Sequence, residues 1–184
     1  MNVAYRTLVL GGVRSGKSHW AEHQFAEDDA LDYIATAAAQ DDDDWADRIA
    51  LHRQRRPHRW RTVETLDLAG ILADSSTPRL IDDLGNWVAR TIDATSGWDG
   101  DLAEFREATE TLVTAWTKHT GRVVLVSNEV GSGVHPESRA GRIFRDELGR
   151  LNTMLAAAAD EVVLVVAGIP LWLRSPVPDD GANR

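Results

Sequence analysis

The chain has 184 residues, 43% of them hydrophobic, so it can bury the core of one domain but not of two. A formal net charge of −9 repels a phosphate backbone, which argues against nucleic acid as a partner. The absence of cysteine excludes disulfides, thiolate metal sites and a cysteine nucleophile.

Short apolar stretches alternate with helical patterns in the first half of the chain. In chain order we predict a strand at Thr7–Leu10, a helix from Gly16 to about Ala26, a strand at Tyr33–Thr36, a helix from Trp45 to about Arg55, and strands at Trp60–Val63 and Arg79–Ile81. Pro57 ends the second of these helices, because the residue before a proline disfavours the helical conformation.

The second half continues the alternation. We predict helices at Leu84–Ile92 and Asp101–Lys118 with a loop at Asp93–Gly100 between them, a strand at Val123–Val126, a glycine-bearing loop at Ser127–Pro136, a helix at Arg139–Ala159, a strand at Glu161–Val166 and an irregular tail at Pro170–Arg184. This order indicates an α/β fold in a single domain, residues 1–184, with a mainly parallel central sheet flanked by helices.

No segment indicates export or membrane insertion. The N-terminal residues run directly into an apolar strand and lack the features of a signal peptide. The apolar run Val162–Ala167 is too short to cross a bilayer. We therefore expect a cytoplasmic protein, which also suits the absence of cysteine.

Between the first predicted strand and helix lies a P-loop, with the pattern G-x-x-x-x-G-K-[ST]. Its residues are Gly11, Gly12, Val13, Arg14, Ser15, Gly16, Lys17 and Ser18. Backbone N–H groups of such a loop surround an anion, while Lys17 would reach the β- and γ-phosphates and Ser18 would ligate Mg²⁺. A chance glycine turn is the alternative, but the strand and helix that the motif requires flank it. The pattern therefore predicts a nucleoside triphosphate site and a P-loop NTPase-like fold.

Two acids follow the strand at Arg79–Ile81. A P-loop enzyme commonly needs a second metal-directed acid at the end of a neighbouring strand, and Asp82 is the preferred candidate, with Asp83 second. The alternative is that both acids merely begin the next helix, where negative charge is favourable.

His52 lies on the helix before Pro57, with arginines at helical spacing around it. Arg48 precedes it by four residues, and Arg55 and Arg56 follow by three and four. Three guanidiniums would attract an anion, and nearby cations keep the imidazole neutral and nucleophilic. The residues alone leave open that this is a solvated basic face at a helix end.

Other polar residues carry weaker signals. His19 and His23 have helical spacing that could hold a metal, although a surface position is favoured. The run Asp41–Asp44 is interpreted as a solvated helix start. Trp60 and Trp87 could be core residues or ligand platforms, and the sequence does not decide between these.

The motifs, in this order, resemble the bifunctional adenosylcobinamide kinase / adenosylcobinamide-phosphate guanylyltransferase family over about residues 7–169. The matching segments are the P-loop GGVRSGKS, Tyr33–Thr36, Arg48–Pro57 followed by Trp60–Glu64, the loop Ser127–Pro136, and Phe144–Asp146 through Ala159–Val162. The histidine segment and the N-E-V-G loop are more specific than the P-loop. One segment departs from the family pattern: the chain reads Asp82-Asp83-Leu84-Gly85 where an Asp-Cys-Leu-Thr-like run is common, with Arg90 where an asparagine is common.

The resemblance implies two reactions. ATP or GTP phosphorylates the aminopropanol hydroxyl of adenosylcobinamide, and GTP then guanylylates a histidine that passes GMP to the new phosphate, giving adenosylcobinamide-GDP for adenosylcobalamin biosynthesis. By position, His52 is the GMP-bearing nucleophile. The nucleotide-binding residues implied beyond the P-loop are Ile34, Ala35, Thr36, Arg53, Gln54, Arg55, Arg56, Glu64 and Asp82, with Ser18 and Asp82 holding Mg²⁺. Family members can be homotrimeric. Two other functions stay open: a plain small-molecule P-loop kinase with a structural His52, and a nucleotide-dependent switch.

Overall fold

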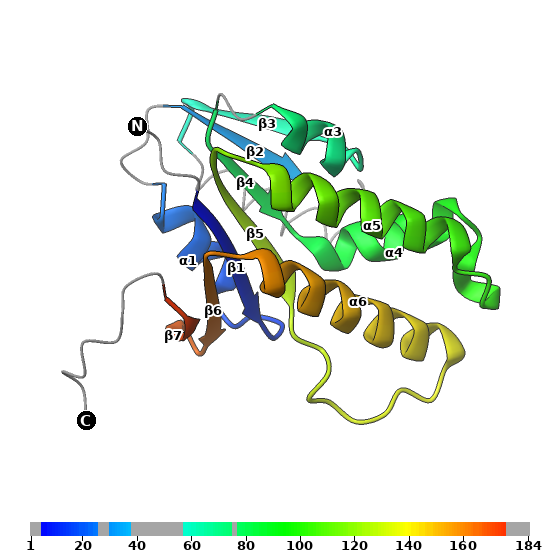
Figure 1. Ribbon diagram of the computed structural model, residues 1–184. Coiled ribbons are helices and arrows are strands. Elements are labelled where there is room, and N and C mark those ends of the chain that lie inside the picture. The colour runs from blue at the N-terminus through cyan, green and yellow to red at the C-terminus, as the bar shows by residue number, and fades with distance from the viewer. Residues whose placement is uncertain (1–4, 26–29, 38–56, 75–76, 176–184) are drawn as a thin grey trace.

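The chain folds around one twisted sheet (Figure 1) in a computed structural model that describes residues 5–25, 30–37, 57–74 and 77–175. The strands lie in the order β3-β2-β4-β5-β1-β6-β7 and are β1 (Tyr5–Gly11), β2 (Leu31–Ala35), β3 (Trp60–Glu64), β4 (Arg79–Asp82), β5 (Arg122–Asn128), β6 (Glu161–Val166) and β7 (Ile169–Arg174). All neighbouring pairs are parallel except β6 with β7. The helices are α1 (Lys17–His23), α3 (Leu68–Ala73), α4 (Leu84–Ala94), the 3-10 helix η1 (Gly97–Asp99), α5 (Ala103–Lys118) and α6 (Arg139–Ala158).

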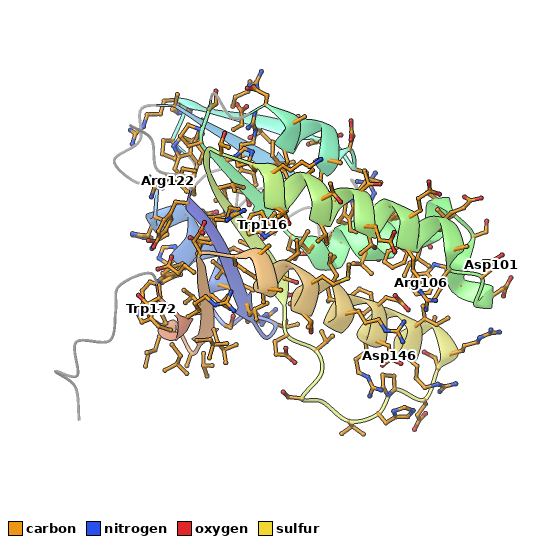
Figure 2. All side chains as sticks on the ribbon, viewed as in Figure 1. Asp101, Arg106, Trp116, Arg122, Asp146 and Trp172 are labelled. Atoms are coloured by element: carbon orange, nitrogen blue, oxygen red, sulfur yellow. The ribbon has the colours of Figure 1, made fainter. Side chains whose placement is uncertain are left out.

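Helices cover both faces of the sheet, so each central strand contributes apolar side chains to two cores. Along β1, Leu8 and Leu10 belong to the core under α3 to α6, whereas Val9 belongs to the core under α1. In the first core the buried Trp116 of α5 donates from Nε1 to the carbonyl of Leu155 on α6, at 3.1 Å (Figure 2). Because strands β1 to β6 run parallel, their carboxyl ends lie at one edge of the sheet, where the loops that follow them meet.

The predicted elements within the described residues are confirmed, with ends that differ by at most three residues. Besides β7, two short elements were not predicted. Helix α3 is one: its N-cap Asp67 accepts a hydrogen bond from the Gly70 amide, at 2.8 Å. The other is η1, inside the predicted loop Asp93–Gly100. The predicted helix from Trp45 to Arg55 and the run Asp41–Asp44 lie outside the described residues.

The prediction of an irregular tail beginning at Pro170 is wrong for its first part, because Ile169–Arg174 is strand β7. A two-residue turn, Ala167-Gly168, reverses the chain, with φ of 52° and 80°, so that β7 pairs antiparallel with β6. Pro170 is tolerated because β7 is an edge strand, which need not donate every backbone N–H to a neighbour. Residues 176–184 lie outside the described part.

Trp60 and Trp87 are both buried in the cores, as the first of the two alternatives for these residues predicts. In the described part of the chain, no helix combines the length and apolar character needed to cross a membrane.

The stability of the fold should depend on pH through the buried His119. Burial lowers the pKa of His119, whose Nδ1 donates to the Leu72 carbonyl at 2.9 Å. As the pH falls through about 6.5, the unfolded chain takes up a proton that the folded chain accepts only at lower pH. The free energy of unfolding should then fall by at most about 1.4 kcal/mol per pH unit.

Urea unfolding across this range would measure the effect in the wild type and in His119→Asn, whose amide keeps a donor but does not titrate. We expect the wild type to lose stability relative to the variant on acidification. Parallel profiles for the two proteins would contradict the assignment.

Candidate active site

The loop between β1 and α1 has the strand–loop–helix context of a P-loop. The Ser15 amide donates to the carbonyl of Gly12 at 3.2 Å and closes a turn, while Arg14 and Gly16 have φ of 57° and 91°. Alternation of ordinary and left-handed conformations turns successive backbone N–H groups toward one side, as in anion-binding nests. This conformation is what the glycine-rich pattern predicts.

Lys17 is the buried cation of this loop, whereas Arg14 is exposed. Its side chain is buried, and Nζ lies 3.5 Å from the carbonyl oxygen of Gly12, so it folds back over the loop. A buried ammonium is costly unless charge or carbonyl oxygens compensate for lost water. Lys17 also acts electrostatically on Asp83, whose pKa it lowers against other effects. The lysine is therefore held at the loop, where a triphosphate would meet it.

Asp82 and Asp83 lie at the end of β4 but have different surroundings. Oδ1 of Asp82 accepts a hydrogen bond from the hydroxyl of Ser18 at 3.1 Å, and its Oδ2 accepts one from Tyr33 at 2.6 Å. Asp83 is the N-cap of α4, where its Oδ1 accepts from the Asn86 amide at 2.8 Å. Asp82 therefore faces the P-loop, while Asp83 begins the next helix.

Burial raises the pKa of Asp83, and the charge of Asp82 raises it further. The hydrogen bonds from Asn86 and Asn128 and the charge of Lys17 oppose this rise. The peptide bond between the two acids is cis. The candidate acids thus form a crowded pair in which Asp82 accepts a hydrogen bond from the P-loop and Asp83 is affected by the charge of Lys17.

The second glycine loop lies directly beside the P-loop. The Glu129 amide donates to the carbonyl of Gly11 at 3.0 Å, and the Asn128 side chain reaches Asp83. Behind them Asn152 of α6 donates to the Asn128 carbonyl at 3.1 Å and accepts from the Ser127 hydroxyl at 2.6 Å. A buried polar network therefore fixes the start of this loop relative to the acids.

The remaining predicted residues of the described part lie near the carboxyl ends of β2 and β3. Thr36 is fully buried, and its hydroxyl donates to the carbonyl of Asp83 at 2.6 Å. Ala35 pairs with Glu64 in the sheet register. Ile34 is enclosed in the core under α3 to α6, so only its backbone, not its side chain, is available to a nucleotide. His52, Arg53, Gln54, Arg55 and Arg56 lie outside the described residues, as does Arg48.

Sequence reasoning missed three residues: Tyr33 and Asn128, which contact Asp82 and Asp83, and Asn152, which holds Asn128 from behind. Asn152 carried a usable signal, because it interrupts the buried face of α6 formed by Leu148, Leu151 and Leu155. Tyr33 had no such signal, since tyrosine is ordinary in a strand.

The structure also shows where the two histidines of α1 lie. His19 and His23 are exposed on α1 with their rings edge to face at 4.4 Å. Among the described residues no group of three or more His, Asp or Glu side chains could hold a metal ion. The exposed position predicted for this pair is therefore confirmed.

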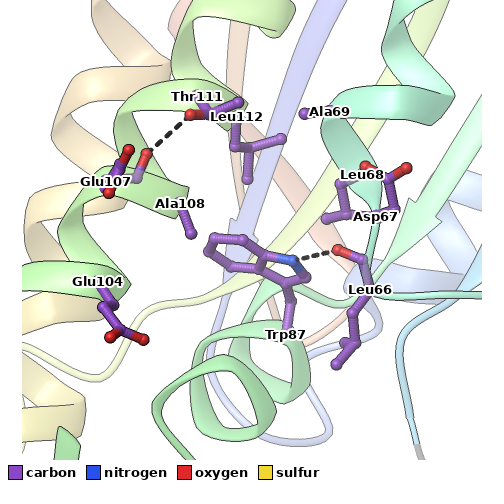
Figure 3. Close-up of a pocket in the computed structure, with 10 residues that line it drawn as sticks. All are labelled: Leu66, Asp67, Leu68, Ala69, Trp87, Glu104, Glu107, Ala108, Thr111 and Leu112. Carbon is purple, nitrogen blue, oxygen red and sulfur yellow. Dashed lines mark hydrogen bonds between the residues drawn. The ribbon is translucent and has the colours of Figure 1, made fainter. Parts of the chain in front are cut away.

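An open pocket of about 360 Å³ lies between α3, α4 and α5 (Figure 3). Trp87 lies at its centre and donates from Nε1 to the carbonyl of Leu66 at 2.9 Å. Asp67, Glu104 and Glu107 contribute carboxylates to its lining. These charges repel phosphate, so the P-loop edge remains the candidate nucleotide site.

Comparison with known proteins agrees with this geometry. Residues 7–173 match the family described as cobinamide kinase / cobinamide phosphate guanyltransferase. The chain belongs to this family. It is therefore an enzyme of the transferase class, with the activities that give the cobinamide kinase / guanyltransferase family its name.

Curated members of the family align over almost their whole length. The bifunctional adenosylcobalamin biosynthesis protein CobU of Escherichia coli (strain K12) is 41% identical over 179 residues, which are 91% of this chain and 98% of the relative. The bifunctional adenosylcobalamin biosynthesis protein CobP of Pseudomonas aeruginosa is 42% identical over 176 residues, 92% of this chain and 97% of the relative.

The fold has a more distant likeness among solved structures. An ATPase from the type III secretion system of pathogenic bacteria superposes with a TM-score of 0.54 at 13% identity, over 88% of this chain. The chain spans about half the length of that ATPase, 51%. This likeness supports the P-loop NTPase-like fold alone.

The structure explains two positions at which this chain departs from the common family pattern, Gly85 and Arg90. The side-chain amide of Asn128 fills the space that a Cβ at Gly85 would need. Arg90 donates from Nη1 to the carbonyl of Thr36 at 2.7 Å. Two of the departures therefore support the loops around the acids: Gly85 makes room for Asn128, and Arg90 ties α4 to the end of β2.

Proposed function

We propose that this enzyme phosphorylates adenosylcobinamide with ATP or GTP and then transfers GMP from GTP, through His52, to give adenosylcobinamide-GDP in adenosylcobalamin biosynthesis. The observation that carries the phosphoryl-transfer half is the contact between Ser18 and Asp82, which joins the P-loop to the acid of β4 at 3.1 Å. Family membership carries the choice of corrinoid as acceptor.

For the first reaction, the P-loop amides and Lys17 would bind the phosphates and offset negative charge on the transferring group. Ser18 and Asp82 would hold Mg²⁺, since both present the oxygen ligands that this ion prefers, and Mg²⁺ takes few protein ligands beside substrate phosphates. When bound, Mg²⁺ would supply electrostatic stabilisation of the phosphates.

For the second reaction, the His52 imidazole would attack the α-phosphorus of GTP, forming an N–P bond while the bond to pyrophosphate breaks. The phosphate of the phosphorylated corrinoid then takes GMP from His52 and restores the imidazole. A covalent intermediate divides one difficult displacement into two easier ones. Arg53, Gln54, Arg55 and Arg56 would bind the nucleotide beside it, with Ala35, Thr36, Glu64 and the Ile34 backbone at the strand ends.

We further propose that the enzyme is cytoplasmic and forms a homo-oligomer, a trimer by family resemblance. Exposed apolar side chains on β7 support an interface between copies, because Ile169, Leu171, Trp172 and Leu173 each keep at least half of their surface exposed.

Incubation with GTP labelled at the α-phosphate, followed by denaturation, tests the histidine step. We expect acid-labile, alkali-stable label on the wild type and none on His52→Ala. His58→Ala is the matched control, because it removes an exposed histidine from the same stretch of chain and should leave the label in place.

Label absent from the wild type would overturn the histidine intermediate, and label that persists in His52→Ala would place it on another residue. The kinase half is tested separately, by phosphate transfer from γ-labelled nucleotide to adenosylcobinamide. Nucleotide binding with no transfer to the corrinoid would instead favour a nucleotide-dependent switch.

A further inference from the structure

Tyr33 places a hydroxyl group inside the core next to the candidate metal site. Its side chain is 1% exposed and packs in the core under α1, which includes Leu80. In the parallel pairing of β2 with β4, Tyr33 lies opposite Leu80 and Ala35 lies opposite Asp82. Tyr33 is therefore one diagonal step from Asp82 on the same face of the sheet, within reach of a long side chain.

The contact itself is short and directed at one oxygen. The Tyr33 hydroxyl donates to Oδ2 of Asp82 at 2.6 Å, in the range of hydrogen bonds to an ionised carboxylate. Ser18 donates to the other oxygen, Oδ1, at 3.1 Å. The two oxygens of Asp82 are thus held by different elements, one by β2 and one by the P-loop helix α1.

A bound metal ion would affect the two hydrogen bonds of Asp82 differently. Ser18 is itself a candidate ligand, so metal binding would compete for the group that holds Oδ1. The Tyr33 hydroxyl approaches from inside the protein and stays available to hold Oδ2. Without the hydrogen bond from Tyr33, the carboxylate of Asp82 could rotate about χ2, a torsion with a broad distribution.

We propose that Tyr33 is a positioning residue for the metal site: its hydroxyl holds Oδ2 of Asp82 so that Oδ1 is presented to Ser18 and to the ion between nucleotide and protein. The inference rests on the proposed role of Asp82 and Ser18 in holding Mg²⁺. Residues that orient a metal ligand commonly change metal affinity by about 10- to 100-fold when they are removed. A tyrosine that only fills the core would affect stability and leave metal affinity unchanged.

The test is Tyr33→Phe, which keeps the ring in the core and removes only the hydroxyl. The readout is the dissociation constant of Mn²⁺, measured by electron paramagnetic resonance on the protein bound to a non-hydrolysable GTP analogue. We expect the constant to rise about tenfold, at the lower end of the range for such residues. In turnover, the Mg²⁺ concentration at half-maximal rate should rise by a similar factor, while the rate at saturating Mg²⁺ stays within about threefold.

Tyr5→Phe is the matched control, since Tyr5 is the other of the two tyrosines. Its hydroxyl also forms a hydrogen bond with a carboxylate, that of Glu161. Tyr5 is, however, the first residue of β1, whereas the P-loop follows the other end of this strand. This variant should bind Mn²⁺ as the wild type does.

A Tyr33→Phe protein that melts at a lower temperature but binds Mn²⁺ within twofold of the wild type would overturn the inference and leave the metal site standing. Wild-type protein whose nucleotide complex binds Mn²⁺ no better than Asp82→Asn would overturn the metal site itself, and the role of Tyr33 with it.

Discussion

Replacement of Lys17 by alanine should lower kcat/KM of both reactions by about 10²- to 10³-fold, the usual cost of removing one donor that stabilises charge in a transition state. Lys17 is buried at the P-loop with Nζ 3.5 Å from the Gly12 carbonyl, and alanine would leave that position without a charge. Steady-state kinetics of the kinase step and the rate of His52 labelling would measure the two effects.

Lys17→Arg should restore little of this activity, although arginine is the more frequent basic residue in this chain. A planar guanidinium does not fit where a compact ammonium is enclosed by a tight loop. The control is Lys118→Ala, which removes the only other lysine, an exposed residue at the end of α5. Full activity in Lys17→Ala would exclude the P-loop as the site of phosphoryl transfer.

Replacement of Gly16 by valine should remove nucleotide binding, with a loss of affinity of at least about 100-fold. Gly16 has a φ of 91°, which a β-branched residue adopts only under strain. A Cβ there would also lie 3.2 Å from Cα of Gly168, in the turn between β6 and β7. Isothermal titration with a GTP analogue would measure the affinity.

The turn that Gly16 contacts is held in place from both sides. The Gly168 amide donates to the carbonyl of Ser15 at 2.8 Å, and Trp172 of β7 packs edge to face on Trp20 of α1, with ring centroids 5.7 Å apart. Neither the loop nor the turn can move away from a new side chain without losing these contacts. Strain and crowding therefore act together at Gly16.

Gly149→Val is the matched control for this change. Gly149 lies on the exposed side of α6, and a Cβ there would meet no atom within 4 Å. It should bind nucleotide as the wild type does, and cooperative thermal melting would verify that both variants fold. If Gly16→Val bound the analogue within threefold of the wild type, the conformation assigned to the P-loop would be wrong.

The two acids of β4 illustrate how far sequence reasoning can go. Both Asp82 and Asp83 fit a metal-directed position, and both also fit a helix start. In the structure Asp83 caps α4, so the helix-start interpretation holds for it, whereas Asp82 accepts a hydrogen bond from Ser18 of the P-loop and its metal-directed role stays a prediction. Adjacent residues on a strand end point in different directions, so their surroundings separate them although their sequence positions do not.

The sequence by itself determined the P-loop and, apart from α3 and η1, the order of the described strands and helices from β1 to β6, because both depend on neighbouring residues. Apolar periodicity and glycine spacing act within a few residues of chain, and the strand–loop–helix around Lys17 is such a local unit. The family resemblance, also carried by contiguous motifs, is confirmed across residues 7–173. The role of His52 stays a prediction, since it lies outside the described residues.

Only the tertiary structure decided which residues support the acids and what becomes of the chain after β6. Tyr33 and Asp82 are separated by 49 positions, and Asn152 and Asn128 by 24, so no local pattern relates them. The strand β7 exists because β6 offers it an open edge and because the turn Ala167-Gly168 adopts left-handed conformations. Such pairings depend on where the whole sheet places distant segments, and that placement follows from packing the two cores together.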